Sequence, residues 1–312
     1  MSLRKFWILI EPRSKILSIL PTLMGLLFSA TYFHSINWTN SVLFFCGSLL
    51  FDATTSSINN IMDFYKGTTH KYRHHSNLVG RNGMNPKITA GIVITMLVIS
   101  VLIGVILAVR VGWILLILGM FCFAVGIFYT FGPLPLSRLP LGELFSGFTM
   151  GVIIPVIAVL VNVEPTGLVG LEFSQMFVTI QFNWQNILAL LLLCIQPTAV
   201  IAGVELANNI SDYDEDLVND RKTIAMYISR QAGLNWYQFL VYVGFFTTTL
   251  AVLIHVLPWQ TLLIWLTLPY VIKLTNIFLA KQHKQETFHT SLIIAGVEMS
   301  AIVVGLLVDL VI

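Results

Sequence analysis

Charged residues are scarce in this chain of 312 residues: Asp, Glu, Lys and Arg together make up 10% of it. Soluble domains carry about 25% charged residues, so the composition argues against a water-soluble globule. The net charge of +2 is too small to indicate a nucleic-acid partner. The three cysteines lie far apart in apolar runs without CxxC spacing, which argues against disulfides and a cysteine metal site. We also find no low-complexity tract and no linker.

Long apolar segments take the place of charge, and 56% of the residues are hydrophobic. Stretches able to cross roughly 30 Å of hydrocarbon recur along the chain. No small-residue cleavage site follows the first one, which favours a membrane helix over a removable signal peptide. The pattern predicts an all-α, polytopic membrane protein, a single domain over 1–312, with nine transmembrane helices bundled around a central cavity. The expected spans are 16–34, 41–62, 88–109, 112–130, 144–162, 186–209, 236–256, 260–279 and 291–311.

The positions of the basic residues indicate an orientation. With the N-terminus inside, nine helices leave 15 of the 17 Lys and Arg on the cytoplasmic side, Arg110 and Lys273 being the exceptions. The positive-inside rule therefore favours a cytoplasmic N-terminus and an outside C-terminus. We expect a multi-pass protein of the cell (plasma) membrane. Its longest outside loop, about 163–185, has no Lys or Arg and is expected on the membrane surface.

Two short series of Asn and Asp residues end two of the apolar segments, and both are expected on the cytoplasmic side. The first ladder is Asn59 and Asp63, and the second ladder is Asn208, Asp212 and Asp216. On a helix, a spacing of four residues stacks side chains on one face about 6 Å apart. Such groups beside a bilayer are energetically expensive, which indicates a site for something cationic. A single Asn-x-x-x-Asp is usually a helix cap, but two copies on the same side favour function.

The ladders suit one chemistry. Mg²⁺ prefers oxygen ligands and often takes one or two carboxylates together with phosphate oxygens. Two facing ladders would hold Mg²⁺ and, through it, a diphosphate leaving group. Lys66, Arg81, Arg221 and Lys222 follow the ladders closely enough to reach phosphate oxygens. Aromatic faces such as that of Tyr129 would shelter an allylic cation beside a hydrocarbon tail.

Other polar residues leave alternatives open. Asp52 and Glu205 lie within apolar segments and are further candidates, with no partner evident from the sequence. His70, His74 and His75 have a spacing compatible with metal binding, although a solvated loop explains them more simply.

The ladders and the nine expected helices resemble the UbiA superfamily of intramembrane aromatic prenyltransferases. Further stretches resemble its 1,4-dihydroxy-2-naphthoate prenyltransferase branch, over about residues 8–230. They are Pro12–Arg13, Lys66–Gly67, Tyr129–Leu136, Leu141–Phe145 and Arg221–Thr223.

The resemblance implies that the chain transfers a polyprenyl group from polyprenyl diphosphate to 1,4-dihydroxy-2-naphthoate. Diphosphate and CO₂ would be lost and demethylmenaquinone formed. The implied catalytic residues are Asp63, Asp212 and Asp216, which would bind Mg²⁺ together with Asn59 and Asn208. The implied diphosphate residues are Lys66, Arg81, Arg221 and Lys222, and those for the acceptor or prenyl group are Arg13, Tyr129, Arg138 and Glu143.

The first ladder departs from the family pattern. Asn60 stands where the family usually has Asp, and Thr68-Thr69-His70 replaces a stretch with a second acidic residue. Weaker Mg²⁺ binding, a shifted substrate or lost activity would each follow from this. Two alternatives therefore stay open: a UbiA-type enzyme with a different aromatic acceptor, and a non-catalytic membrane protein that binds isoprenoid.

Overall fold

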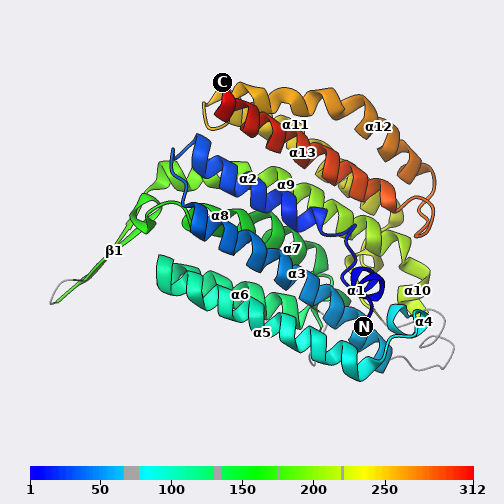
Figure 1. Cartoon of the computed structure of the whole chain (residues 1–312). Helices are drawn as coiled ribbons and strands as arrows, with labels where there is room; N and C mark the ends of the chain where they lie inside the picture. Colours follow the sequence, from blue (N-terminus) through cyan, green and yellow to red (C-terminus); the bar gives the residue numbers. More distant parts are fainter. Residues whose placement is uncertain (67–76, 130–134, 174–175, 219–220) are drawn as a thin grey trace.

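The computed structural model describes residues 1–66, 77–129, 135–173, 176–218 and 221–312, and its elements are labelled in Figure 1. The helices of the N-terminal half are α1 (Leu3–Leu9), α2 (Ile16–Thr31), α3 (Trp38–Lys66), α4 (Leu78–Arg81), α5 (Pro86–Val111), α6 (Trp113–Phe128), α7 (Gly142–Phe148) and α8 (Ile154–Leu160). Those of the C-terminal half are α9 (Trp184–Ser211), α10 (Tyr213–Val218), α11 (Arg230–Leu253), α12 (Ile264–Ala280) and α13 (His289–Val311). Short 3₁₀ turns cover Leu136–Arg138, Pro165–Gly167, Ile224–Met226 and Trp259–Leu263.

The expected membrane helices are largely present. Within the described residues, seven helices are long and apolar enough to cross a membrane. Two shorter apolar helices, α2 and α6, coincide with the two other expected spans. The helical membrane fold is therefore confirmed, whereas the count of nine is not, because α2 and α6 have only 16 residues each.

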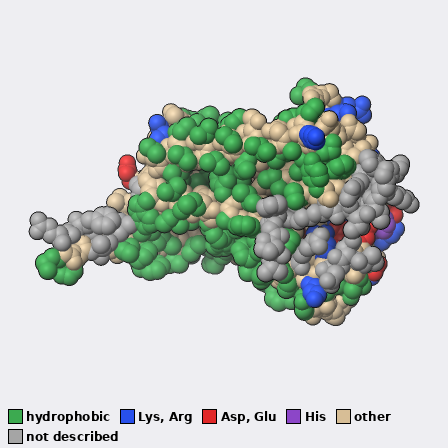
Figure 2. All heavy atoms as spheres, turned by 90° about the horizontal axis from the view of Figure 1, so that it is seen from below, with side chains coloured by type: hydrophobic (Ala, Val, Ile, Leu, Met, Phe, Trp, Pro, Cys, Tyr) green, Lys and Arg blue, Asp and Glu red, His purple; other side chains and the backbone are tan. Residues whose placement is uncertain are grey.

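The elements divide the molecule into an apolar middle and two ends. Figure 1 shows the N-terminus, α4 and α10 at one end, and strand β1 and the C-terminus at the other. Because α4 follows α3 and α10 follows α9, both ladders lie at the end that holds the N-terminus. On the face in Figure 2, hydrophobic side chains cover the middle of the molecule, as expected for a surface that meets lipid.

The apolar segment expected at 144–162 is helical but irregular. It runs as α7, a π-helical turn at Thr149–Ile153 (η3) and α8, which begins next to Pro155. A π turn inserts an extra residue into a helix and often marks a functional region. At Gly151, an added Cβ would lie 2.4 Å from the backbone of Thr198, so only glycine permits this close approach to α9.

A β-hairpin departs from the all-α expectation. Strand β1 (Val169–Phe173) pairs antiparallel with β2 (Val178–Phe182) in the loop expected at 163–185. The hairpin protrudes from the end opposite α4 and α10 (Figure 1). Its β-branched and aromatic residues suit a strand. Each strand has only five residues, so the sequence pattern did not distinguish it from the many other apolar stretches.

Candidate functional site

The second ladder keeps its helical stacking although α9 ends at Ser211. The amide of Asp212 donates to the Asn208 carbonyl at 3.0 Å, and that of Asp216 donates to the Asp212 carbonyl at 2.8 Å. These bonds continue the i to i+4 pattern from α9 into α10. The three side chains therefore follow one face of the chain, as their spacing predicts.

A lysine from a distant segment meets this ladder. Lys284, in the connection between α12 and α13, donates hydrogen bonds from Nζ to Asn208 Oδ1 and Asp212 Oδ2. The same ammonium forms an ion pair with Asp212. An amide oxygen and a carboxylate oxygen thus already converge on one cation.

Asp216 is the most buried member of the ladder, with 2% of its surface exposed. Arg221 Nη1 lies 3.4 Å from its Oδ1, and its Oδ2 has no hydrogen-bond partner within the part of the chain that the structure describes. Burial raises the pKa of the Asp216 carboxyl, and the neighbouring Arg221 opposes that rise. An unsatisfied, buried carboxylate oxygen is costly and marks a place for a ligand.

The first ladder is arranged differently. Asn59 lines the apolar cavity described below, and Asp63 is half-buried one turn further along α3. The neighbouring Asn60, which replaces an acidic residue of the family pattern, is buried and lies away from that cavity. Its Nδ2 donates to Glu11 Oε1 at 2.8 Å and to the Ser56 carbonyl at 3.1 Å.

Asn60 therefore holds the N-terminal segment on α3. Its own carbonyl accepts a 3.0 Å hydrogen bond from Asn77 Nδ2, which fixes the start of α4 as well. A carboxylate at this position would lack the N–H donor and would face the Glu11 carboxylate. The amide is thus explained by packing at this corner.

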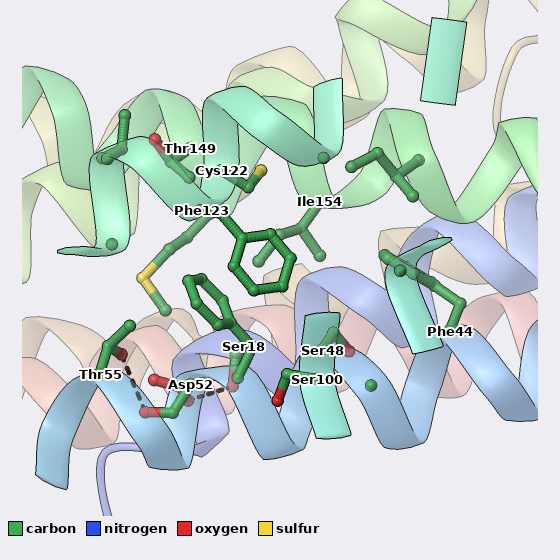
Figure 3. A pocket seen from close by; sticks show the side chains of 18 of the residues that line it. Ser18, Phe44, Ser48, Asp52, Thr55, Ser100, Cys122, Phe123, Thr149 and Ile154 are labelled. Atoms are coloured by element: carbon green, nitrogen blue, oxygen red, sulfur yellow. Dashed lines mark hydrogen bonds between the residues drawn. The ribbon is translucent and has the colours of Figure 1, made fainter. Parts of the chain in front are cut away.

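An apolar cavity of about 320 Å³ lies among α2, α3, α5, α6, α7, η3 and α8. Phe51 and Phe123 form part of its wall, with ring centroids 4.1 Å apart. Figure 3 shows Ser18 and Asp52 on one wall, across from Cys122 and Thr149. Its size lies at the lower end of the range for pockets that enclose small organic ligands, roughly 300–1,000 Å³.

One wall of this cavity carries a buried ion pair. Lys15 Nζ lies 3.0 Å from Asp52 Oδ1 and donates a 2.6 Å hydrogen bond to Ser56. Ser18 donates to Asp52 Oδ2 at 2.6 Å. Asp52 is thus paired, which the sequence did not reveal, because its partner lies 37 positions away on the first turn before α2.

Two further hydrogen bonds reach α9 beside the second ladder, one of them from a residue of the cavity wall. Tyr129, which lines the cavity, donates a 2.8 Å hydrogen bond to Glu205 Oε1 on α9. One turn further along α9, Asn209 Nδ2 donates to Glu143 Oε1 on α7 at 2.7 Å. The predicted acceptor residues Tyr129 and Glu143 therefore both reach α9 close to Asn208.

Several predicted residues lie apart from these groups. Arg81 and Lys222 are exposed at the ladder end, and Arg13 is exposed and does not line the cavity. Lys66 and Arg138 have side chains outside the described part of the structure. The described part of the structure also excludes four complete residues, which are Thr69, His70, His74 and His75.

Two residues at the site were missed by sequence reasoning. Lys284 was counted only as a cytoplasmic charge, and Lys15 only as a flank of the first helix. Each pairs with an acid on a distant helix, and a single sequence contains no signal for such a pairing. Their proximity to the ends of apolar segments was the available hint, because a lysine there often has a buried partner.

The donor set of the second ladder fits a divalent metal ion. Amide and carboxylate oxygens converge on the Lys284 ammonium. The buried Oδ2 of Asp216, which has no hydrogen-bond partner among the described residues, adds another oxygen donor one turn away. Among the described residues, no group of three His, Cys, Asp or Glu side chains surrounds a single point. Mg²⁺ does not need such a cage, since it uses one or two carboxylates and completes its shell with water and phosphate oxygens.

Comparison with known proteins decides the family. The model of the UbiA prenyltransferase family matches residues 18–297. The chain belongs to this family. It is also 29% identical over 231 residues to the 1,4-dihydroxy-2-naphthoate octaprenyltransferase of Bacillus subtilis. The aligned region covers 73% of this chain and 67% of that protein. The resemblance drawn from the sequence motifs is therefore confirmed.

Solved structures of UbiA homologues share the fold. The apo homologue from Aeropyrum pernix K1 superposes with a TM-score of 0.68 at 17% identity, covering 95% of this chain and 98% of that one. The homologue from Archaeoglobus fulgidus bound to GPP and Mg²⁺ has a TM-score of 0.62 at 13% identity, with 99% and 100% covered. At these identities the likeness shows the helical UbiA fold.

Proposed function

We propose that this UbiA family member transfers a polyprenyl group from polyprenyl diphosphate to 1,4-dihydroxy-2-naphthoate in a Mg²⁺-dependent reaction. The C1–O bond of the allylic diphosphate breaks and diphosphate leaves with the bonding electrons. C1 then bonds to the ring carbon that bears the carboxylate. CO₂ departs and leaves its bonding pair to restore the aromatic ring, which gives demethylmenaquinol, the reduced form of demethylmenaquinone.

The observation that carries the proposal is the second ladder next to an apolar cavity. Asn208, Asp212 and Asp216 supply oxygen donors, and the Tyr129–Glu205 hydrogen bond links α9 to the cavity wall. When bound, Mg²⁺ supplies neutralisation of the leaving diphosphate. The chain's own part is to orient that group with these oxygens and with Arg221, and to shield the allylic cation from water within apolar walls.

The acceptor end is proposed to be the wall that contains Asp52. Its carboxylate is held by Lys15 and Ser18 and faces the cavity, where it would accept a hydrogen bond from a ring hydroxyl. Such a bond raises the electron density of the ring carbon that attacks C1. Glu143 and Tyr129 would position the ring beside the diphosphate end, and Asn59 and Asp63 would complete the site from α3.

The identity of the acceptor is supported by the Bacillus subtilis relative, whose name contains 1,4-dihydroxy-2-naphthoate. The cytoplasmic placement of both ladders is proposed from the clustering of Lys and Arg in the loops at their end. The chain would act as a single membrane-embedded domain over 1–312 in the cell membrane. Lys66, Arg81 and Lys222 would attract and hold diphosphate there, and Arg13 and Arg138 would attract the acceptor carboxylate.

The test combines purified full-length protein in detergent, Mg²⁺, radiolabelled polyprenyl diphosphate and 1,4-dihydroxy-2-naphthoate. The proposal predicts a prenylated naphthoquinol together with equal amounts of diphosphate and CO₂. Absence of these products above an Asp212→Ala control would overturn it. A panel of other hydroxylated aromatic acids, assayed in parallel, identifies a different acceptor. Retention of the labelled polyprenyl diphosphate by the protein without turnover of any acceptor indicates an isoprenoid-binding protein.

A further inference from the structure

The cation at the second ladder is part of the chain itself. The connection between α12 and α13 carries Lys284, whose ammonium bridges Asn208 Oδ1 and Asp212 Oδ2 across 72 to 76 positions of sequence. These are the oxygens that the proposed function assigns to a metal ion. One position thus serves two cations that cannot occupy it together.

The segment that contains Lys284 is a turn held by side-chain hydrogen bonds. Thr287 Oγ1 accepts from the His283 amide at 2.9 Å and donates to the Lys281 carbonyl at 2.7 Å. The Lys284 ammonium also lies 4.8 Å from the centre of the Phe288 ring, which adds a cation–π contact. These contacts keep the lysine beside the ladder without help from a ligand.

The ammonium nevertheless has a route away from the ladder. The side chain of Lys284 is 41% exposed, whereas that of Asp212 is 15% exposed, so the lysine approaches from the solvent side. A metal ion that binds Asn208 and Asp212 would displace the ammonium outward and repel it, because both are positive. A diphosphate bound to that metal reverses the interaction, since its oxygens are strong acceptors for an ammonium.

We propose that Lys284 couples metal binding to diphosphate binding at the second ladder. Without diphosphate it competes with the metal ion for Asn208 and Asp212. With diphosphate present it donates to the phosphate oxygens, so the metal ion and the diphosphate bind together more readily than either binds alone. The residue thereby disfavours a metal-loaded site that has no substrate. This inference rests on the proposed diphosphate site and is independent of the aromatic acceptor.

A binding experiment without acceptor tests the coupling. Mn²⁺ affinity of the full-length protein is measured by electron paramagnetic resonance, with and without geranyl thiolodiphosphate, an analogue that resists ionisation. Mn²⁺ serves as a paramagnetic substitute for Mg²⁺. The coupling is the Mn²⁺ dissociation constant without the analogue divided by the one with the analogue. In Lys284→Gln we expect tighter Mn²⁺ binding without the analogue and a ratio lowered by about 10-fold relative to wild type, a typical size for coupling between two ligands.

Lys281→Gln is the matched control, because Lys281 belongs to the same turn but pairs with the exposed Glu286 at 2.5 Å. Its ratio should equal that of wild type, and Lys284→Arg, which keeps the charge, should retain most of the coupling. An unchanged ratio in Lys284→Gln would overturn the inference, as would an equal fall in Lys281→Gln. Prenyl transfer by the wild type is tested separately, so failure of the reaction and failure of the coupling are distinguishable.

Discussion

The two ladders have similar spacing but different surroundings. Asn208 and Asp212 meet Lys284, and Asp216 meets Arg221, so basic side chains from the chain itself contact the second ladder. In the first ladder, Asn59 faces the apolar cavity and the adjacent Asn60 secures the N-terminal segment.

The difference separates two uses of similar residues. Carboxylates that already attract internal cations are prepared for a metal ion and a diphosphate, because cation exchange there avoids an unpaired buried charge. Asn60, which connects the N-terminal segment and the start of α4 to α3, contributes stability and orientation. We therefore propose the second ladder as the main anchor for the diphosphate, with one further carboxylate, Asp63, supplied from α3.

Removing the central carboxylate of the second ladder should have the largest effect. We expect Asp212→Ala to reduce kcat for prenyl transfer by about 1,000-fold, because it removes an oxygen donor at the developing charge. The control is Asp214→Ala, since Asp214 is exposed in α10, which begins directly after Asp212, and should retain wild-type activity. Similar losses in both variants would show that α10 is merely disrupted.

The first ladder should respond less strongly. Asp63→Asn keeps the size of the side chain and removes its charge, and we expect kcat to fall by about 100-fold. Steady-state assays at saturating Mg²⁺ measure this effect, with Asp309→Asn near the far end of α13 as the control. A loss larger than that of Asp212→Ala would reverse the ranking of the two ladders.

A substitution of Asp52 on the cavity wall should affect the reaction with the aromatic acceptor and leave metal binding unchanged. We expect Asp52→Asn to lower kcat/KM for the aromatic acceptor by about 10-fold, the size of one hydrogen bond to a charged group. Mn²⁺ binding should be unchanged, because Asp52 lies on the cavity wall beside Ser18 and Lys15. Ser48→Ala, at the same cavity, is the control. A change in Mn²⁺ affinity without a change in kcat/KM for the acceptor would contradict this assignment.

The smallest effect concerns Asn60. Restoring the family's acidic residue with Asn60→Asp should lower the free energy of unfolding by about 1 kcal/mol, because the donor to Glu11 is lost and two carboxylates meet. Thermal unfolding in detergent measures this. The double variant Asn60→Asp with Glu11→Gln should recover stability, since a donor returns to the pair. Tighter Mn²⁺ binding with no loss of stability would instead place residue 60 at the metal.

The sequence predicted the parts of the site that are local. Helical spacing stacked Asn208, Asp212 and Asp216 correctly, because the backbone keeps its i to i+4 bonds through the end of α9. The apolar segments predicted the membrane helices because length and hydropathy follow directly from residue type.

Contacts between distant segments were beyond the sequence. Lys284 and Asp212 meet only because α13 and α9 pack together, and the pairing of Lys15 with Asp52 depends on how α2 crosses α3. The replacement of Asp by Asn at residue 60 suggested a weakened metal site, whereas its hydrogen bonds to Glu11 and Asn77 give it a packing role. Side-chain direction at a helix end depends on neighbours that one sequence does not reveal.

A single comparison of variants decides whether the second ladder is the main anchor for metal and diphosphate. Mn²⁺ binding is measured by electron paramagnetic resonance in the presence of geranyl thiolodiphosphate for wild type, Asp63→Asn and Asp212→Asn. We expect a substantially weaker Mn²⁺ affinity in Asp212→Asn than in Asp63→Asn. An equal loss in both variants, or a larger loss in Asp63→Asn, would contradict it.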